Sequence, residues 1–562
     1  MTAAGCAALL VAAYANSFQN AFQFDDQSVV VNNVYLRSLA NVPRFFADAR
    51  TYSSFPANTT YRPLVSTTLA VDYAIGGGLS PAAFRADQLL LMLALGALLI
   101  PLFRRVMDEA APGGGNRWLA LFAATLFCVH VVHTETMNLM HVRSELLSTA
   151  GLVAAFVVYG DGRRASRRWL SLAPMALGAF AKIPAVLFAP LLFTWEYLRA
   201  RDTGAPPRDR LRTALRAAAP ATVAGGALYV LVERVMHAAL QSYGGADAYR
   251  YALTQAWAWV HYLRLFFLPF GLSADTDLRL IERWHDPRVL LGLLVIALLA
   301  VTAWRSARRR EHRPIAFGLA WYMIALLPAS SVLPISEPIN EHRPFVAYIG
   351  LVLAVVWAAR LALDAAARRW TGARRARAVA PLACALVLLA HAVGVHARNR
   401  VWRTDETLWA DVTTKSPHNG RAWMNYGVAL MARARWQPAK EAFERALLLV
   451  PTYHLVPVNL GVLAAATGDD ASAERHFRRA IQLGPATPDV YDFYARFLIR
   501  KGRGAEAAPL LERALAVAPA DVAAATMLRE LRGAPSTAPA AGPARPWSEG
   551  ADRVPARAPA AR

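Results

Sequence analysis

The chain has 562 residues, of which 56% are hydrophobic and only 18% are charged, and its formal net charge is +22. Long apolar stretches recur between Ala3 and His396, too many for the core of a soluble protein, which excludes that class. The arginines gather in short loops between these stretches, as the orientation of membrane helices requires. This distribution argues against nucleic-acid binding. The three cysteines lie inside apolar stretches and predict neither a disulfide nor a ligand set.

Taken in chain order, the apolar stretches predict an all-α, polytopic membrane bundle of about eleven spans. The first stretch is short, and no basic residue precedes it, so it matches a secretory signal poorly. The spans that we expect are 3–18, 84–103, 118–132, 144–160, 169–182, 183–198, 216–233, 288–304, 314–333, 344–363 and 378–397.

Basic residues concentrate in five connections between these spans. The connections are 104–105, 163–168, 199–216, 305–313 and 368–377, and the positive-inside rule places all five in the cytoplasm. The loops 19–83, 130–143, 234–287 and 330–343 and the C-terminal region are then outside. This orientation requires the apolar segment 252–270 to lie in the interface or to re-enter. Its tryptophans, Tyr262 and the charge of Arg264 suit that depth.

Ionisable residues cluster in all four outer loops, where they are costly and usually face a cavity. A carboxylate there can take a proton from an acceptor hydroxyl, while arginine and histidine can hold a leaving phosphate. The pattern therefore favours transfer of a group from an anionic lipid carrier. The loops contribute Asp25, Asp26, Tyr61 and Arg62, then His130, His133, Glu135, His141, Arg143 and Glu145, then Asp275 and Asp277, and finally Glu337, Asn340, Glu341, His342 and Arg343.

Each group also has a structural interpretation. Asp25 and Asp26 would be a helix cap, as would Asp275 and Asp277, and the Glu341-His342-Arg343 run would be an interface anchor. Lys182 would neutralise a helix end or a carboxylate. His130, His133 and Glu135 would bind a metal, although their H-x-x-H-x-E spacing lacks the helical pattern of the known zinc motifs. The functional interpretation depends on all of these groups sharing one side.

The C-terminal part repeats with a period of 34 residues. Four prolines, Pro417, Pro451, Pro485 and Pro519, are separated by that interval, and small residues and aromatic or leucine residues between them keep the same register. This is a tetratricopeptide pattern and predicts a short α-solenoid over 417–532. We expect a membrane domain over 1–397, a linker helix over 398–416, and a disordered tail over 533–562, where alanine, proline and arginine dominate.

Five motifs in order resemble the transmembrane-and-tetratricopeptide O-mannosyltransferase family. They are Phe24-Asp25-Asp26 with Tyr61-Arg62-Pro63-Leu64, then His130 to Glu135 with Arg143-Ser144-Glu145, then Tyr262-Leu263-Arg264-Leu265 through Ser273, then Asn340-Glu341-His342-Arg343, and last Trp402 to Trp409. The resemblance covers nearly the whole chain up to about Pro519. One departure is Arg85, which follows Phe84 where the family tends to have a histidine.

The resemblance implies an inverting glycosyltransferase of GT-C type. Such enzymes take a sugar, mannose in the animal members, from a polyprenyl-phosphate donor on the non-cytosolic face. The superfamily keeps its catalytic carboxylate in the first outer loop, which carries over to Asp25 and Asp26. Metal dependence, on Mg or Mn, stays open because superfamily members differ.

The remaining site residues are expected to serve the donor. Arg62, Arg143, His342 and Arg343 would contact its phosphate, and Glu135, Glu145 and Glu341 would shape the pocket or position those cations. Tyr61, His133, Asp275 and Asp277 are further pocket candidates. We expect a multi-pass protein of the bacterial inner membrane, with the repeats on the periplasmic side presenting a protein or peptide acceptor.

Two other functions compete with this interpretation. One is a non-catalytic membrane scaffold whose repeats recruit partner proteins. The other is a transporter of the carrier lipid, which would need access to the cavity from both sides. The only polar residues expected on the inner face are the arginines that set the orientation.

Overall fold

The computed structural model describes residues 2–55, 58, 60–113, 115–160, 165–236, 247–328, 337–369, 372–519 and 521–533. All regular elements in these ranges are helical, as the composition predicts. The chain forms two compact units. Unit 1 comprises the residues up to Ala274 together with 278–404, and unit 2 comprises Asp275–Asp277 and the residues from Asp405 onward. Apart from Gly533, the tail predicted to be disordered lies outside the described residues.

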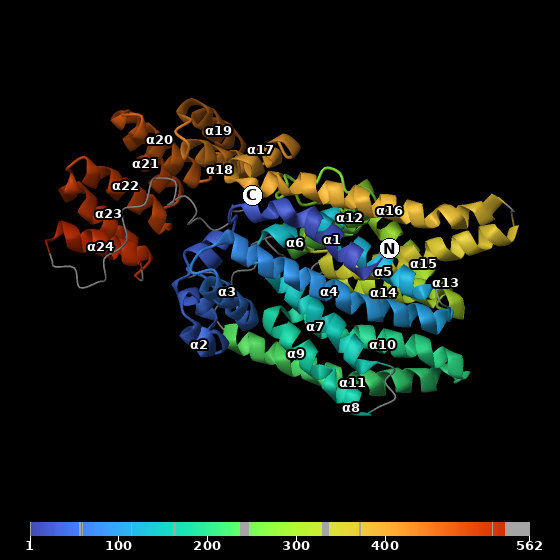
Figure 1. The fold of residues 1–562 in the computed structure, drawn as a ribbon. Coiled ribbons are helices and arrows are strands. Elements are labelled where there is room, and N and C mark those ends of the chain that lie inside the picture. The colour runs from blue at the N-terminus through green and yellow to red at the C-terminus, as the bar shows by residue number, and fades with distance from the viewer. Residues whose placement is uncertain are drawn as a thin grey trace. The chain divides into compact units, whose positions relative to one another are not determined.

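Unit 1 is a helical bundle that contains both long and short helices (Figure 1). Its helices are α1 (Ala3–Tyr14), α2 (Val42–Ala47), α3 (Pro63–Ile75), α4 (Pro81–Ala110), α5 (Asn116–Cys128), α6 (Thr134–Asn138), α7 (Arg143–Tyr159), α8 (Ala165–Leu170), α9 (Leu172–Ala181), α10 (Phe188–Arg199), α11 (Pro207–Met236), α12 (Ala248–Phe267), α13 (Pro287–Ser306), α14 (Arg313–Leu326), α15 (Phe345–Arg369) and α16 (Gly372–Asn399).

The number of helices that can cross a membrane is smaller than predicted. By length and composition, five helices of the described residues qualify, namely α4, α11, α13, α15 and most of α16; the bent pair formed by α5 and Val131–Asn138 would make a sixth. The prediction of about eleven spans is therefore wrong. The stretches predicted at 3–18, 144–160, 169–182, 183–198 and 314–333 form helices of only 10 to 17 residues. About 20 residues are needed to cross the hydrocarbon core.

The two ends of unit 1 bring together different parts of the chain. At one end, called here the loop end, the Asn20 side chain donates to the Asn138 side chain and the Asn399 carbonyl, at 2.6 and 3.0 Å. At the other end, called here the arginine end, Arg310 donates to the Glu109 carbonyl at 2.9 Å. Because α4 is 30 residues long, the two ends lie about 45 Å apart along this helix.

Three of the five basic connections meet at the arginine end. Arg199 pairs with Glu109 of α4 at 3.2 Å, and Arg313 pairs with Asp202 at 2.6 Å. The connections 104–105, 199–216 and 305–313 are thus neighbours, as a shared side requires.

Helices α14 and α15 pack closely, because a Cβ atom on Gly318 would lie 2.4 Å from the Gly350 carbonyl oxygen.

Helix α12 contacts the loop end at three positions between Gln255 and Phe266. Gln255 donates to the Pro338 carbonyl at 2.8 Å, and the Tyr262 carbonyl accepts from Tyr348 at 2.7 Å. The Phe266 carbonyl lies 3.0 Å from the His130 ring. A helix that crossed the membrane would have its two ends at opposite ends of the bundle. Because these contacts all lie at the loop end, they favour the interpretation of 252–270 as an interface-lying helix.

Unit 2 is a stack of helix pairs (Figure 1). After α17 (Asp405–Lys415) come α18 (Gly420–Met431), α19 (Trp436–Leu449), α20 (Leu455–Ala466), α21 (Asp470–Leu483), α22 (Pro488–Arg500), α23 (Gly504–Val517) and α24 (Val522–Leu531). The second helices of the pairs begin at 436, 470 and 504, which matches the 34-residue period. In each pair, an aromatic ring or a leucine fills the space between the two helices, and one hydrophobic core connects all three pairs.

The glycine of the repeat is required by the neighbouring ring. A Cβ atom on Gly427 would lie 2.5 Å from a ring carbon of Phe443, so Gly427→Val is expected to destabilise unit 2 by roughly 1–3 kcal/mol. Ala432→Val is the matched control, because Ala432 ends the same helix and is exposed. Proteolysis of the full-length protein should cut residues 405–533 faster in Gly427→Val only. Equal cutting of both variants would contradict this packing.

Candidate functional site

Asp25 and Asp26 follow a strained residue at the loop end of unit 1. Phe24 has a φ of +52°, which is unusual for a bulky residue and costs about 1–3 kcal/mol. Its ring packs at 6.2 Å from the buried Trp402 ring, which helps to hold this conformation. As a result, Asp26 is fully buried, whereas its neighbour Asp25 is exposed. The two carboxylates, which the sequence could not distinguish, therefore occupy different environments.

Asp26 organises the second loop. Its Oδ2 accepts from the Met140 backbone N–H at 2.9 Å, and its Oδ1 accepts from the His141 backbone N–H at 2.8 Å. The His141 ring nitrogen Nδ1 also lies 2.8 Å from Oδ1. Both oxygens of Asp26 are thus occupied by residues 140 and 141. Asp25 stays close enough for its charge to act on His141.

These carboxylates favour the charged form of His141. Burial alone would lower its pKa, but the hydrogen bond to Asp26 and the charges of Asp26 and Asp25 outweigh burial and raise the pKa. Arg62, which donates to the Tyr52 hydroxyl at 3.1 Å, carries a further positive charge close to His141. The acid pair of the first loop thus faces cations from two segments.

The raised pKa of His141 predicts a pH-dependent stability. A raised folded-state pKa stabilises the protein below the unfolded value of about 6.5, and this stabilisation is lost as the pH rises through the folded value. We expect the difference in melting temperature between the wild type and His141→Gln to be largest near pH 6 and to shrink at higher pH. The exposed His285→Gln is the control and should keep the wild-type profile. A difference that does not change with pH would contradict the pairing.

Two further pairs connect the second loop to other segments. The His342 ring nitrogen Nδ1 lies 3.0 Å from Oε1 of Glu135, and the Lys182 ammonium contacts Oε1 of Glu145. Burial and the neighbouring charges of Lys182 and Arg343 lower the pKa of His342 to about 3, so its ring is neutral at neutral pH. His342 can therefore contact a phosphate as a neutral hydrogen-bonding group.

The charges of these groups act on one another, which shows that they converge. The Lys182 ammonium lies within electrostatic range of Arg62 and Arg343, and His342 lies within range of His141. The first, second and fourth predicted loops therefore share one site at the loop end. Arg343 is anchored there by donating to the Pro338 carbonyl at 2.8 Å.

Arg143 is fully engaged by the protein. Its guanidinium is completely buried and pairs with Asp72 at 2.6 Å and with Asp87 at 3.0 Å. It also donates to the Gln88 side chain and the Phe84 carbonyl, at 3.0 and 2.9 Å. These contacts join α7 to α3 and α4 and favour a structural role over the predicted contact with a donor phosphate.

Other predicted residues also have contacts that are structural. The Tyr61 hydroxyl donates to the Phe46 carbonyl at 3.0 Å. His133 is buried between the rings of Phe127 and Phe345, each at 4.6 Å. Glu341 is buried with its carboxylate 3.8 Å from Arg398 of α16.

The third predicted loop contributes to unit 2 instead. Asp275 pairs with Arg421 of α18 at 2.8 Å, and Asp277 accepts from the His418 backbone N–H at 3.1 Å. The Asn419 side chain donates to the Thr276 carbonyl at 3.1 Å. Asp275 and Asp277 thus bind the start of the first helix pair, which favours a structural role for both.

Sequence reasoning missed some of the residues that build the site. Arg85, noted only as a departure, donates to the Asn20 and Ala21 carbonyls at 3.0 and 2.7 Å and so fixes the start of the first loop. The prediction that Lys182 neutralises a carboxylate is confirmed by its ion pair with Glu145. Lys182 also stands out in the sequence as the only lysine before Lys415.

The residues at the loop end do not form a metal site by themselves. Within the described ranges, no three His, Cys, Asp or Glu side chains are placed to hold a metal ion together. Both oxygens of Asp26 already accept hydrogen bonds.

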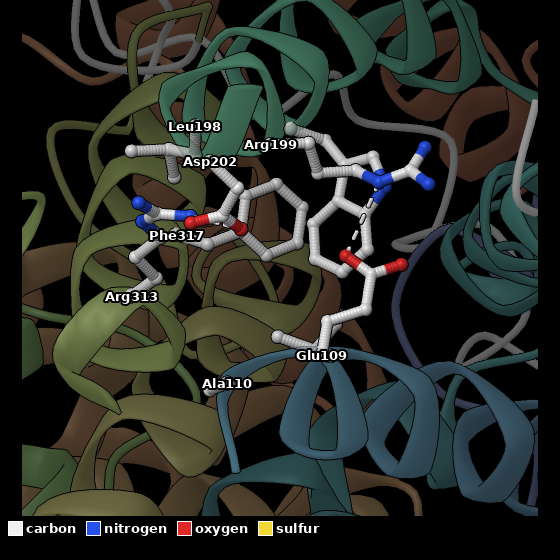
Figure 2. A pocket seen from close by; sticks show the side chains of 9 residues that line it. Glu109, Ala110, Leu198, Arg199, Asp202, Arg313 and Phe317 are labelled. Atoms are coloured by element: carbon white, nitrogen blue, oxygen red, sulfur yellow. Dashed lines mark ion pairs between the residues drawn. The ribbon is translucent and has the colours of Figure 1, made fainter. Parts of the chain in front are cut away.

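A small cavity lies at the opposite, arginine end of unit 1. It measures about 30 Å³, room for one or two waters. Figure 2 shows Glu109 of α4 reaching Arg199 across it, with Asp202 and Arg313 nearby. The cavity is too small for a sugar, and the acids and bases that line it are paired with each other, so the candidate site is the one at the loop end.

Known proteins support the resemblance seen in the motifs, although no family model matches the chain. Protein O-mannosyl-transferase Tmtc3 of Drosophila melanogaster is 24% identical over 560 residues, covering 87% of this chain and 59% of that protein. Protein O-mannosyl-transferases TMTC3 and TMTC1 of Homo sapiens are 22% and 23% identical, covering 85% and 83% of this chain. The chain spans 54% to 59% of the length of these relatives.

Among solved structures, the crystal structure of the APC/C hetero-tetramer Cut9-Hcn1 aligns with 84% of this chain and 89% of that chain. The TM-score is 0.23 at 12% identity, which is too low to indicate a shared fold. The alignments of the sequence relatives extend over both units, and the chain is homologous to the TMTC protein O-mannosyl-transferases over most of its length.

Proposed function

We propose that this protein is a membrane glycosyltransferase of GT-C type. It would move a sugar, mannose by analogy with its relatives, from a polyprenyl-phosphate donor to a hydroxyl group of a protein acceptor. The observation that carries the proposal is an exposed carboxylate, Asp25, whose charge acts on His141 at the end of unit 1 where Arg62, Lys182 and Arg343 lie within electrostatic range of one another. Homology to protein O-mannosyl-transferases supports the same chemistry.

Asp25 is the proposed general base, because it is the member of the acidic pair whose carboxylate is exposed. It takes the proton of the acceptor hydroxyl as the hydroxyl oxygen attacks the anomeric carbon from the face opposite the phosphate. The bond between the anomeric carbon and the phosphate oxygen breaks, and polyprenyl phosphate leaves with the electron pair. The configuration at the anomeric carbon is inverted.

Asp26 is a positioning residue in this scheme. Its hydrogen bonds to Met140 and His141 fix the second loop against the first. The charges of both carboxylates act on His141, so the first and second loops are coupled at this point. Asp25, next to the strained Phe24, is exposed and therefore accessible to an acceptor, whereas Asp26 is buried.

The leaving phosphate would be received by the cations of the site. Arg62 offers a planar fork for phosphate oxygens, and Arg343 adds a second positive charge. Glu135 and Glu145 hold His342 and Lys182 in place. Arg143 supports the site from within by joining α7 to α3 and α4.

The positive-inside rule places this site on the non-cytosolic side, in the periplasm of a bacterium, with the protein in the inner membrane. Connections rich in arginine meet at the other end of unit 1, which supports the assignment. The helix pairs of unit 2 would bind the acceptor as an extended peptide or a helix, as such solenoids commonly do.

Lipids extracted from a strain without this protein test the function. We expect a polyprenyl-phosphate sugar to accumulate, as read by mass spectrometry, and to return to the normal level with the wild type but not with Asp25→Asn. Full recovery with Asp25→Asn, combined with failure of a chain lacking residues 417–532, would contradict the transferase and support the scaffold.

A further inference from the structure

Lys182 occupies a break between two helices of unit 1. Helix α9 ends at Ala181, and Lys182 is extended, with φ −164° and ψ +136°. Pro184 follows two residues later and cannot continue the helical hydrogen bonding. The Ser148 hydroxyl donates to the Lys182 carbonyl at 2.8 Å, so α7 holds the backbone of this break. The ammonium is thereby presented between α7 and the first loop.

Positive charges from two other segments lie near this ammonium. Glu145 is its ion-pair partner, while Arg62 and Arg343 both lie within electrostatic range. Packing three cations together is costly unless an anion joins them. The Lys182 side chain is 28% exposed, so it is open to such an anion. Its three donors allow it to keep Glu145 and to bind a second group.

Apolar side chains lie close to Lys182 in the chain. Phe180 and Ile183, on either side of Lys182, pack into a cluster with Ala49, Tyr61 and Val232. The rings of Phe180 and Phe46 meet edge to face at 5.7 Å, and Phe46 is 39% exposed. Figure 1 shows α9 beside α2 and α3 at the loop end. A cation bordered by accessible apolar surface matches a lipid phosphate better than a free phosphate ion.

We propose that Lys182 binds the phosphate of the lipid-linked donor, with Glu145 as its counter-ion in the empty site, and that the isoprenoid chain leaves over the cluster around Phe180. This assignment rests on the proposed function and adds to it the residue that holds the leaving group. Lysine suits this role because its compact ammonium group can move with the phosphate as negative charge develops on the phosphate. Arg143 is held in place by its ion pairs with two carboxylates.

The chain offers an unusually clean test, because it contains only four lysines. The full-length protein in detergent would be treated with an amine-acylating reagent, and modification would be read residue by residue by peptide mass spectrometry. Lys415, Lys440 and Lys501 belong to unit 2 and are internal controls in the same sample. A polyprenyl monophosphate at ten times its dissociation constant is expected to slow acylation of Lys182 about tenfold and to leave the controls unchanged.

Two other probes separate the parts of the ligand. Polyprenol, which lacks the phosphate, and inorganic phosphate, which lacks the chain, should each protect Lys182 much less at the same concentration. Equal protection by polyprenol would overturn the phosphate contact, equal protection by inorganic phosphate would overturn the lipid contact, and absence of protection by polyprenyl phosphate would overturn the whole assignment.

Binding by variants gives a second readout. Lys182→Gln is expected to weaken polyprenyl phosphate binding by roughly tenfold to a hundredfold. The double variant Lys182→Gln with Glu145→Gln removes both charges and covers the case in which the single variant fails to fold; it should bind as weakly. Lys415→Gln, which breaks another lysine–carboxylate pair, is the matched control and should bind like the wild type. Wild-type affinity in the double variant would contradict the proposal.

The outcomes also separate this inference from the proposed function. Sugar transfer that depends on Asp25, without protection of Lys182 by the lipid, would contradict the role of Lys182 but not the transferase function. Protection of Lys182 in a protein that transfers no sugar would contradict the transferase function but not the role of Lys182.

Discussion

Replacing Asp25 by asparagine is expected to lower the rate of sugar transfer by about 10²- to 10⁴-fold, the usual contribution of a positioned general base. Asparagine has nearly the same shape, and Asp25 is exposed, so folding should be unaffected. The rate would be measured with the purified full-length protein, a polyprenyl-phosphate sugar and an acceptor peptide, and the melting temperature would be measured in parallel.

The control for Asp25→Asn is Glu311→Gln, which also neutralises an exposed acid but lies at the arginine end. Its transfer rate should match that of the wild type. Asp26→Asn provides a contrast, because it weakens the buried pair with His141 and should lower the melting temperature as well as the rate. A rate for Asp25→Asn within a few-fold of the wild type would remove Asp25 as the base.

Arg143→Met is expected to destabilise unit 1 by roughly 3–5 kcal/mol, because it leaves the buried carboxylate of Asp72 without its partner. Asp72 is the most affected. Burial already raises its pKa to about 7, and the Arg143 charge is what opposes the rise. The measurement is the fraction of full-length protein that stays monodisperse in detergent after heating.

The double variant Arg143→Met with Asp72→Asn should recover part of this loss, since the buried uncompensated charge is gone. Arg288→Met is the matched control, because its pair with Asp286 at 2.8 Å is solvent-exposed and such pairs contribute little to stability. Equal stability of Arg143→Met and Arg288→Met would contradict the structural role of Arg143 and favour its contact with the donor.

The features that depend on local patterns were predictable from the sequence. The 34-residue period places the second helices of the repeats at 436, 470 and 504 because small residues must recur wherever two helices touch. The orientation rule predicts only that the first, second and fourth outer loops share a side; the structure adds the contacts of Asp26 with His141 and of Glu135 with His342, which join these loops. That rule places loops on a side without needing their contacts.

The features that depend on tertiary contacts were not predictable. Nothing in the Asp25-Asp26 pair shows which carboxylate is buried, because the strained Phe24 and the distant Met140 decide it. Arg143 looked like a phosphate ligand because its partners, Asp72 and Asp87, lie on other helices. The span count was too high because hydropathy does not reveal that an apolar stretch ends after 10 to 17 helical residues.

The most direct test of sugar transfer at this site is a product balance. The purified protein would be given a polyprenyl-phosphate sugar and an acceptor peptide, and both products would be quantified. The account predicts one polyprenyl phosphate released for each glycosylated peptide, with inverted anomeric configuration in the NMR spectrum. Donor that stays intact in the presence of every acceptor offered, or a glycosylated peptide with retained configuration, would contradict it.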